Sequence, residues 1–124
     1  MKTIKLLLSA LALLAATVAQ AEPYTQEAFD RLQSEGKPTL VAVHADWCPT
    51  CKRQAPIIDA LLKQPPYSAI TLLKVDFDTQ KDIVKSLRVP RQSALIVYKN
   101  GKEVGRTLGD TSRTGIENLL KRAI

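Results

Sequence analysis

Residues 39–56 read TLVAVHADWCPTCKRQAP, and the character of the sequence changes halfway along this stretch. The first half, Thr39–Ala45, is rich in valine and other apolar residues, which predicts a buried strand. The second half places Cys48 and Cys51 where helix-forming residues begin. The first turn of a helix has unpaired N–H groups and a partial positive charge, so a cysteine placed there has its pKa lowered. The other cysteine lies one turn away and can close a disulfide with it, which suits this segment to thiol–disulfide exchange.

These two cysteines are the only ones in the chain, which limits their possible roles to redox chemistry, a zinc site or a structural disulfide. A structural zinc site needs four ligands, and the sequence adds only His44 to the two thiols. A purely structural disulfide is a second alternative, but a bond that closes so short a loop constrains the unfolded chain little. Redox chemistry at Cys48 and Cys51 is therefore the interpretation that the pattern favours, and it needs neither a metal nor another cofactor.

The N-terminal segment has the features of a secretory signal peptide. Two lysines precede an apolar run, Leu6–Val18, and Ala19-Gln20-Ala21 has the small-x-small pattern of a cleavage site. A retained membrane anchor is the alternative, but the run is shorter than the ~20 residues that a spanning helix needs. We expect residues 1–21 to be removed and residues 22–124 to form one domain. Export to the periplasm, or to another oxidising compartment, would allow disulfides to persist.

The charge of the chain excludes one class of partner. The formal net charge is +6, but the lysines and arginines are scattered and form no basic run with interleaved aromatic residues. Such a run is typical of nucleic-acid binding, so we expect no nucleic acid partner. A modest positive charge of this kind is typical of a solvated surface.

The rest of the chain predicts an alternation of helices and strands. Before the middle of the chain we expect a helix that Thr25 caps and Gly36 ends, the strand Thr39–Ala45, and a helix from Thr50 or Cys51 to Lys63. Beyond it we expect a strand at Ala69–Phe77, a helix from Thr79 or Asp82 to Leu87, strands at Ala94–Lys99 and Lys102–Leu108 joined by the turn Asn100-Gly101, and a last helix capped by Thr111 or Ser112. This order predicts an α/β fold with a mixed sheet and helices on both faces.

Several motifs resemble those of one known family. The most specific is Trp47-Cys48-Pro49-Thr50-Cys51-Lys52, followed by Ala55-Pro56-Ile57 and Asp59; further matches are Lys74-Val75-Asp76, Lys99-Asn100-Gly101 and Gly109. In these residues the chain resembles the thioredoxin family along nearly all of residues 22–124. The resemblance implies a thioredoxin-like fold and thiol–disulfide exchange with protein substrates. It also implies that Cys48 is the exposed nucleophile and Cys51 the more buried resolving thiol.

One departure from the family pattern concerns proton transfer. The family places a buried aspartate six residues before the first cysteine, and this chain has Ala42 at that position. Lys74, which resembles the usual lysine partner of the aspartate, has therefore lost that partner. Deprotonation of Cys51 then depends on water or on another group.

Two further departures concern the backbone. The family has a cis-proline before the third strand, facing the cysteines. Counting back from the hairpin turn places Ser93 there, whereas Pro90 would need two extra residues in the loop. We favour Ser93, with a trans Gln92–Ser93 bond, because a cis bond before a non-proline residue costs ~2.5–4 kcal/mol. The family's usual first strand is missing here or reduced to a few residues around Tyr24.

Four residues near the cysteines are candidates for supporting roles. The dipeptide Pro49-Thr50 differs from the Gly-Pro of reducing thioredoxins, and a Thr50 hydroxyl that donated to a thiolate would make the disulfide more oxidising. Alternatively, Thr50 only faces solvent. His44 either lowers the pKa of Cys48 as an imidazolium or is a core residue. We expect Trp47 to be partly exposed and to contact partners.

The sequence therefore predicts an exported thiol–disulfide oxidoreductase whose direction, oxidase or reductase, stays open. Its expected partners are protein thiols or disulfides and a redox partner protein, and the expected state is a monomer without stable membrane insertion. The competing hypothesis is a non-catalytic binding module with the same fold and a permanently oxidised Cys48–Cys51 disulfide.

Overall fold

The computed structural model describes residues 21–124. The predicted signal peptide, residues 1–21, lies outside the described residues except for Ala21. Among the helices of residues 21–124, none is long and apolar enough to cross a membrane.

A five-stranded mixed sheet forms the centre of the domain, in the order β1-β3-β2-β4-β5. Strands β1 and β2 run parallel to β3, while β4 runs antiparallel to both β2 and β5. The strands are β1 (Glu22–Pro23), β2 (Thr39–His44), β3 (Thr71–Asp76), β4 (Ala94–Lys99) and β5 (Lys102–Leu108). The two-residue β1, directly before Tyr24, is the reduced first strand that the family resemblance predicted.

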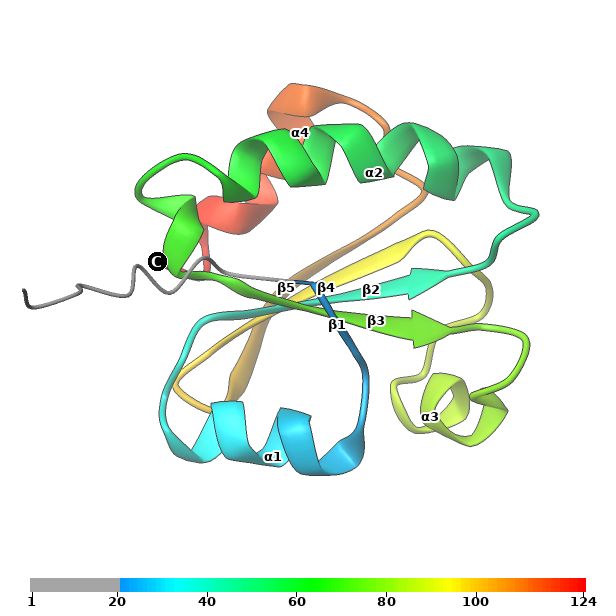
Figure 1. Cartoon of the computed structure of the whole chain (residues 1–124), viewed down its shortest axis with the longest axis horizontal. Coiled ribbons are helices and arrows are strands. Elements are labelled where there is room, and N and C mark those ends of the chain that lie inside the picture. Colours follow the sequence, from blue (N-terminus) through cyan, green and yellow to red (C-terminus); the bar gives the residue numbers. More distant parts are fainter. Residues whose placement is uncertain (1–20) are drawn as a thin grey trace, which may run out of the picture.

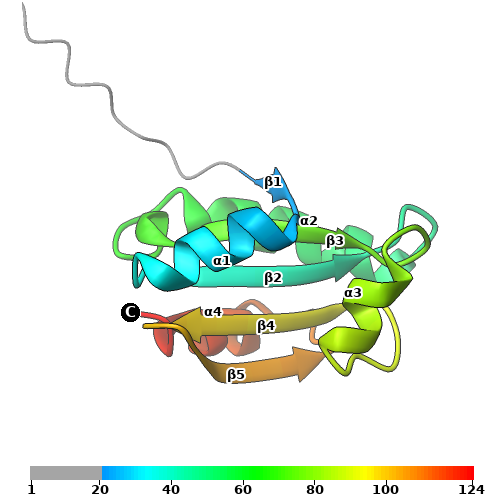
Figure 2. The same ribbon diagram turned by 90° about the horizontal axis from the view of Figure 1, so that it is seen from below.

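Four α-helices cover the two faces of the sheet, with α2 and α4 on one face and α1 and α3 on the other (Figures 1 and 2). The helices are α1 (Gln26–Ser34), α2 (Pro49–Leu62), α3 (Lys81–Ser86) and α4 (Arg113–Lys121). The α/β fold with helices on both faces is thus confirmed. Figure 1 also shows that β2 and β3 point toward the end of the molecule at which α2 begins.

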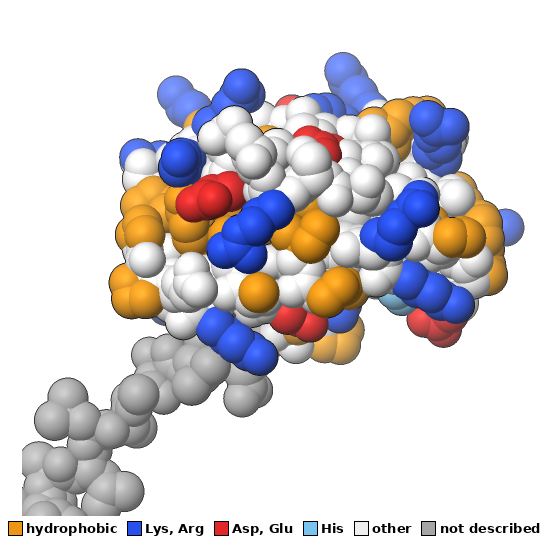
Figure 3. Space-filling view, turned by 90° about the horizontal axis from the view of Figure 1, so that it is seen from above, with side chains coloured by type: hydrophobic (Ala, Val, Ile, Leu, Met, Phe, Trp, Pro, Cys, Tyr) orange, Lys and Arg blue, Asp and Glu red, His pale blue; other side chains and the backbone are white. Residues whose placement is uncertain are grey.

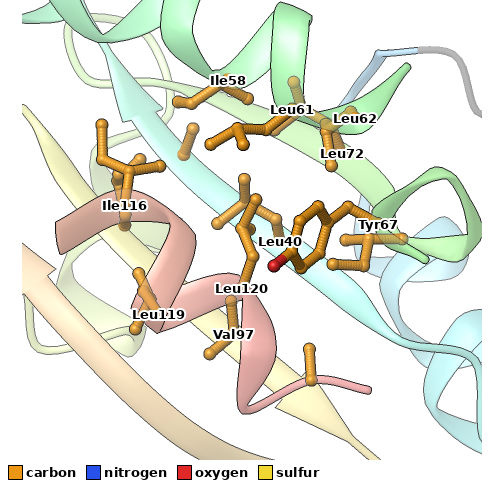
Figure 4. Close-up of a cluster of buried hydrophobic side chains, with 14 residues drawn as sticks. Leu40, Ile58, Leu61, Leu62, Tyr67, Leu72, Val97, Ile116, Leu119 and Leu120 are labelled. Carbon is orange, nitrogen blue, oxygen red and sulfur yellow. The ribbon is translucent and has the colours of Figure 1, made fainter. Parts of the chain in front are cut away.

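The sheet separates two hydrophobic cores. On the side of α2 and α4, helix residues such as Leu61 and Leu120 pack onto Leu40 of the sheet (Figure 4). On the side of α1 and α3, Leu32 and Val84 pack onto the alternate sheet residues, among them Val41. Because neighbouring strand residues point to opposite faces, the strands β2 and β4 are apolar on both sides.

Strand β3 and helix α3 begin at residues other than those predicted. The second predicted strand begins at Thr71 instead of Ala69, because Tyr67–Ala69 form a short 3-10 helix. Helix α3 begins at Lys81, between the two predicted starts, Thr79 and Asp82, and Gln80 is its N-cap residue. The side chain of Gln80 instead accepts from the N–H of Asp76 at 2.9 Å.

Figure 3 shows the face that α2 and α4 cover. Lysine and arginine side chains are spread over it among hydrophobic and acidic ones and form no continuous stripe. This face therefore has the mixed composition that the sequence predicted for a solvated surface.

Candidate active site

The two cysteines lie where β2 passes through a short loop into α2. Cys48 is the N-cap residue of α2, and its Sγ accepts a hydrogen bond from the N–H of Cys51 at 3.2 Å. Pro49 occupies the first helical position, where its fixed φ suits the helix and its missing N–H costs nothing. The sequence therefore places the Cys48 sulfur at the end of a helix whose unpaired N–H groups favour negative charge.

Ser93, in the loop before β4, lies against both sulfurs. Its Oγ is 3.1 Å from Cys48 Sγ and 3.3 Å from Cys51 Sγ, and the residue is only 4% exposed. Pro90 is exposed in the preceding loop, so Ser93 is the residue that faces the cysteines. The only cis peptide bond among residues 21–124 is Pro65-Pro66, so the Gln92–Ser93 bond is trans.

The backbone of Ser93 is held on three sides. Its N–H donates to the carbonyl of Val43 at 2.8 Å, and its carbonyl accepts from the N–H of Gly109 at 3.0 Å and from Gln54 Nε2 at 3.1 Å. Ser93 has a φ of 74°, a left-handed conformation that is uncommon for a residue with a Cβ. The surrounding hydrogen bonds keep the residue in this conformation and so fix where its hydroxyl lies.

The environment separates the pKa values of the two thiols. Burial by itself would raise the pKa of Cys48, but hydrogen bonds from the side chains of Cys51 and Ser93 and from the N–H groups of Cys51 and Thr50 hold this pKa below its ordinary value. Burial raises the pKa of Cys51, and its hydrogen bond to Cys48 and the charge of Cys48 raise it further. Cys48 is therefore the thiol that ionises first, as the nucleophile of a dithiol pair must.

The implied exposure of Cys48 is wrong for this structure, since Cys48 is 1% exposed and Cys51 is 3% exposed. The physical reason is local packing, because both cysteines cluster with Ala45 and Phe77.

Trp47, the residue before Cys48, is an exposed aromatic residue at the active site. The residue is 57% exposed, and its indole Nε1 donates to Asp78 Oδ2 at 2.8 Å. The hydrogen bond fixes the indole against the loop after β3, so a large apolar surface is held beside Cys48.

Three further residues named in the sequence analysis, Ala42, His44 and Lys74, line a cavity next to Cys51. This cavity, with about 20 Å³ of space accessible to water, is lined by Ala42, His44, Cys51, Asp59 and Lys74, among others. His44 is half-buried, and its Nε2 lies 3.0 Å from Asp46 Oδ1. Lys74 is exposed, so the loss of its aspartate partner does not leave a buried ammonium. The backbone N–H of Thr50 contributes to the lowered pKa of Cys48.

Two residues of this site were not predicted from the sequence. Gln54 is 3% exposed and donates through one Nε2 to the carbonyls of Ser93 and Asp110. A polar residue on the buried face of a predicted helix, one turn after Cys51, is the signal that would have identified Gln54. Nothing local in the sequence links Asp78 to Trp47.

Comparison with known proteins gives the family. A sequence profile described as Thioredoxin matches residues 20–122. The chain belongs to the thioredoxin family. Thioredoxin of Chlamydia muridarum is 34% identical over 83 residues, which cover 67% of this chain and 79% of that protein. Thioredoxin-1 of Saccharomyces cerevisiae is 33% identical over 85 residues, which cover 68% of this chain and 81% of that protein.

A solved structure shares the fold closely. The protein named Trxlp from Edwardsiella tarda EIB202 has a TM-score of 0.79 and 46% sequence identity, and the match covers 82% of this chain and 98% of that chain. Thioredoxins are thiol–disulfide oxidoreductases that act on protein disulfides, and this chain is one of them. Within residues 21–124, no group of three or more His, Cys, Asp or Glu side chains is arranged to hold a metal ion.

Proposed function

We propose that this chain is an exported oxidoreductase that donates its Cys48–Cys51 disulfide to the thiols of protein substrates. The proposal is carried by one observation, the set of hydrogen bonds on Cys48 Sγ from Ser93 and from the N–H of Cys51. Hydrogen bonds to a thiolate stabilise the reduced form of a dithiol pair. A stabilised reduced form makes the corresponding disulfide more oxidising.

The residue at position 42 affects the rate at which Cys51 exchanges its proton. Reduction of a substrate requires Cys51 to lose its proton before it attacks the mixed disulfide. The pKa of Cys51 is raised by its burial, and Ala42 stands where the family has a carboxylate to accept that proton. Without this carboxylate, attack of Cys51 on a mixed disulfide is slower than in the family pattern, and in the opposite direction the leaving Cys51 thiolate takes its proton from water.

The surface beside the cysteines supports a protein substrate. Trp47 exposes 57% of its surface next to Cys48, and aromatic side chains of this kind are enriched in protein interfaces. The features of residues 1–21 support export, and in an oxidising compartment a separate redox partner protein would re-oxidise the Cys48–Cys51 pair.

The direction is tested by equilibrating residues 22–124 with reduced and oxidised glutathione and measuring the oxidised fraction after acid quenching. We expect a reduction potential above the value of roughly −270 mV that is typical of a reducing thioredoxin. A potential at or below that value would contradict the donor role and indicate a reductase.

The substrate class and export are tested in cells that express the full chain. Cys51→Ser should accumulate mixed disulfides with substrate proteins through Cys48, whereas the matched variant Cys48→Ser should accumulate none. A binding module with a permanent disulfide would give no mixed disulfide in either variant. Intact-mass analysis of the exported wild type should show a chain that begins at Glu22, and a soluble form that retains Met1 would contradict cleavage.

A further inference from the structure

The Ser93 hydroxyl is shared between the two cysteine sulfurs, and not only with Cys48. The hydroxyl lies within 3.3 Å of both sulfurs, and Ser93 is 4% exposed. Water therefore has little access to this oxygen, and the two sulfurs are the partners within its reach. A hydroxyl has one hydrogen to donate, so it can stabilise negative charge on only one sulfur at a time.

We propose that Ser93 is a third catalytic residue, whose hydroxyl donates its hydrogen bond to whichever cysteine sulfur leaves as a thiolate. In the first step, a substrate thiolate attacks Cys48 Sγ. The Cys48–Cys51 bond breaks, and Cys51 leaves with the electron pair while Ser93 donates to it. The Cys51 thiolate then takes a proton from water.

In the second step, the other substrate thiolate attacks the substrate sulfur of the mixed disulfide. The bond between that sulfur and Cys48 breaks, and Cys48 leaves as a thiolate that accepts the Ser93 hydrogen bond. The substrate has lost two electrons and the protein has gained them. The Ser93 hydroxyl lies at similar distances from Cys48 Sγ and Cys51 Sγ, so by rotating it can donate to Cys51 in the first step and to Cys48 in the second.

The backbone at Ser93 supports a functional constraint at this position. A φ of 74° is strained for serine, and glycine would adopt it without strain. Strain of this kind persists only where the surroundings enforce it, and it clusters at functional sites. Here hydrogen bonds to Val43, Gln54 and Gly109 hold the residue in place. Serine thus occupies a position that glycine would fit with less backbone strain.

Other charged or titratable groups also surround Cys51, and they matter for the pH dependence. Cys48 lies on the same helix, and His44, Asp59 and Lys74 line the cavity on the side of Cys51. Cys51 also interacts with the Cys48 side chain and with the backbone N–H of Ala45, which lowers its pKa. Two further contacts of Cys51 Sγ are Ser93 Oγ at 3.3 Å and the carbonyl of Val43 at 3.9 Å. Of these two, only the hydroxyl can donate to a thiolate.

The test compares Ser93→Ala with Ser93→Gly, since both remove the hydroxyl but only glycine also relieves the backbone strain. Attack of glutathione on the oxidised protein measures the first step. The second step is measured on the Cys51→Ser background, as attack of free glutathione on the Cys48–glutathione mixed disulfide. We expect both variants to slow each step by about tenfold or more, the effect of one hydrogen bond to a charged group. The pH midpoint for alkylation of Cys48 should also rise.

Ser86→Ala removes an exposed serine hydroxyl, which donates to the carbonyl of Ile83, and serves as the matched control. Wild-type rates in folded Ser93→Ala and Ser93→Gly would overturn the proposal. A loss that occurs in Ser93→Ala but not in Ser93→Gly would also overturn it, because strain would then be the cause. The inference rests on the proposed exchange chemistry. The donor role is tested by the reduction potential, whereas the role of Ser93 is tested by the rates of the two steps. Either test can therefore fail without the other.

Discussion

Cys48 and Cys51 differ in what surrounds each sulfur. Hydrogen bonds that favour the thiolate converge on Cys48 and lower its pKa, while burial and the neighbouring Cys48 raise the pKa of Cys51. At neutral pH the fraction of thiolate is therefore larger at Cys48, although this thiol is no more exposed than Cys51.

This difference predicts the order of alkylation in the reduced protein. Cys48 should react with iodoacetamide through a pH midpoint below the ordinary thiol value, and Cys51 through a midpoint above it, because only the thiolate is nucleophilic. Peptide mass spectrometry after timed quenching measures the two sites separately. Equal rates at neutral pH would contradict the assignment of Cys48 as the nucleophile.

A second prediction for a single residue concerns Ala42. Ala42→Asp places a carboxylate at the cavity beside Cys51 and Lys74, where it can accept the proton of Cys51. We expect faster reduction of a protein disulfide near neutral pH, together with a loss of stability on the order of 1–3 kcal/mol, because a charge is placed in an apolar site.

The matched control for that variant is Ala42→Asn, which has a similar size but no charge. It should destabilise the domain without increasing the rate of reduction. The measurements are denaturant unfolding of the oxidised domain and single-turnover reduction. If Ala42→Asp stays folded and reduces no faster than wild type, proton transfer from Cys51 does not limit the reaction.

At the scale of elements, local chemistry explains which boundaries could be predicted. The hairpin from β4 to β5 has the predicted bounds because Asn100 and Gly101 both adopt a positive φ, as a two-residue turn between right-twisted strands requires. Helix α1 begins after Thr25 for an equally local reason, since Thr25 Oγ1 accepts from the N–H of Ala28 at 3.0 Å.

The cap of α1 gives a prediction for stability. Thr25→Ala leaves the N–H of Ala28 without this acceptor and should lower the free energy of unfolding by ~1 kcal/mol, whereas Thr25→Ser keeps the acceptor. Urea unfolding should show a lower midpoint for the alanine variant at an unchanged slope. An equal loss in the serine variant would show that the methyl group of Thr25, and not the hydroxyl, stabilises the domain.

At the scale of the whole molecule, the fold could be predicted from alternating apolar segments, but the site could be predicted only in part. The helix-terminal position of Cys48 follows from neighbouring residues. In contrast, Ser93 reaches Cys48 across 45 positions of the chain, and Trp47 reaches Asp78 across 31. The donation from Gln54 to the Ser93 carbonyl likewise joins two segments that only the folded sheet brings together. No local pattern encodes such contacts.

The two outer strands of the sheet have a consequence for how the protein behaves in concentrated solution. Strand β1 has only two residues, and Pro23 removes one donor from that edge. Strand β5 carries Lys102, Glu103 and Arg106, and its register with β4 shifts between Val97 and Tyr98. Short, charged and irregular edges discourage the addition of a strand from another molecule, which is the first step toward amyloid-like aggregation. Repeated unfolding and refolding in a crowded compartment should therefore carry little risk of edge-to-edge polymerisation.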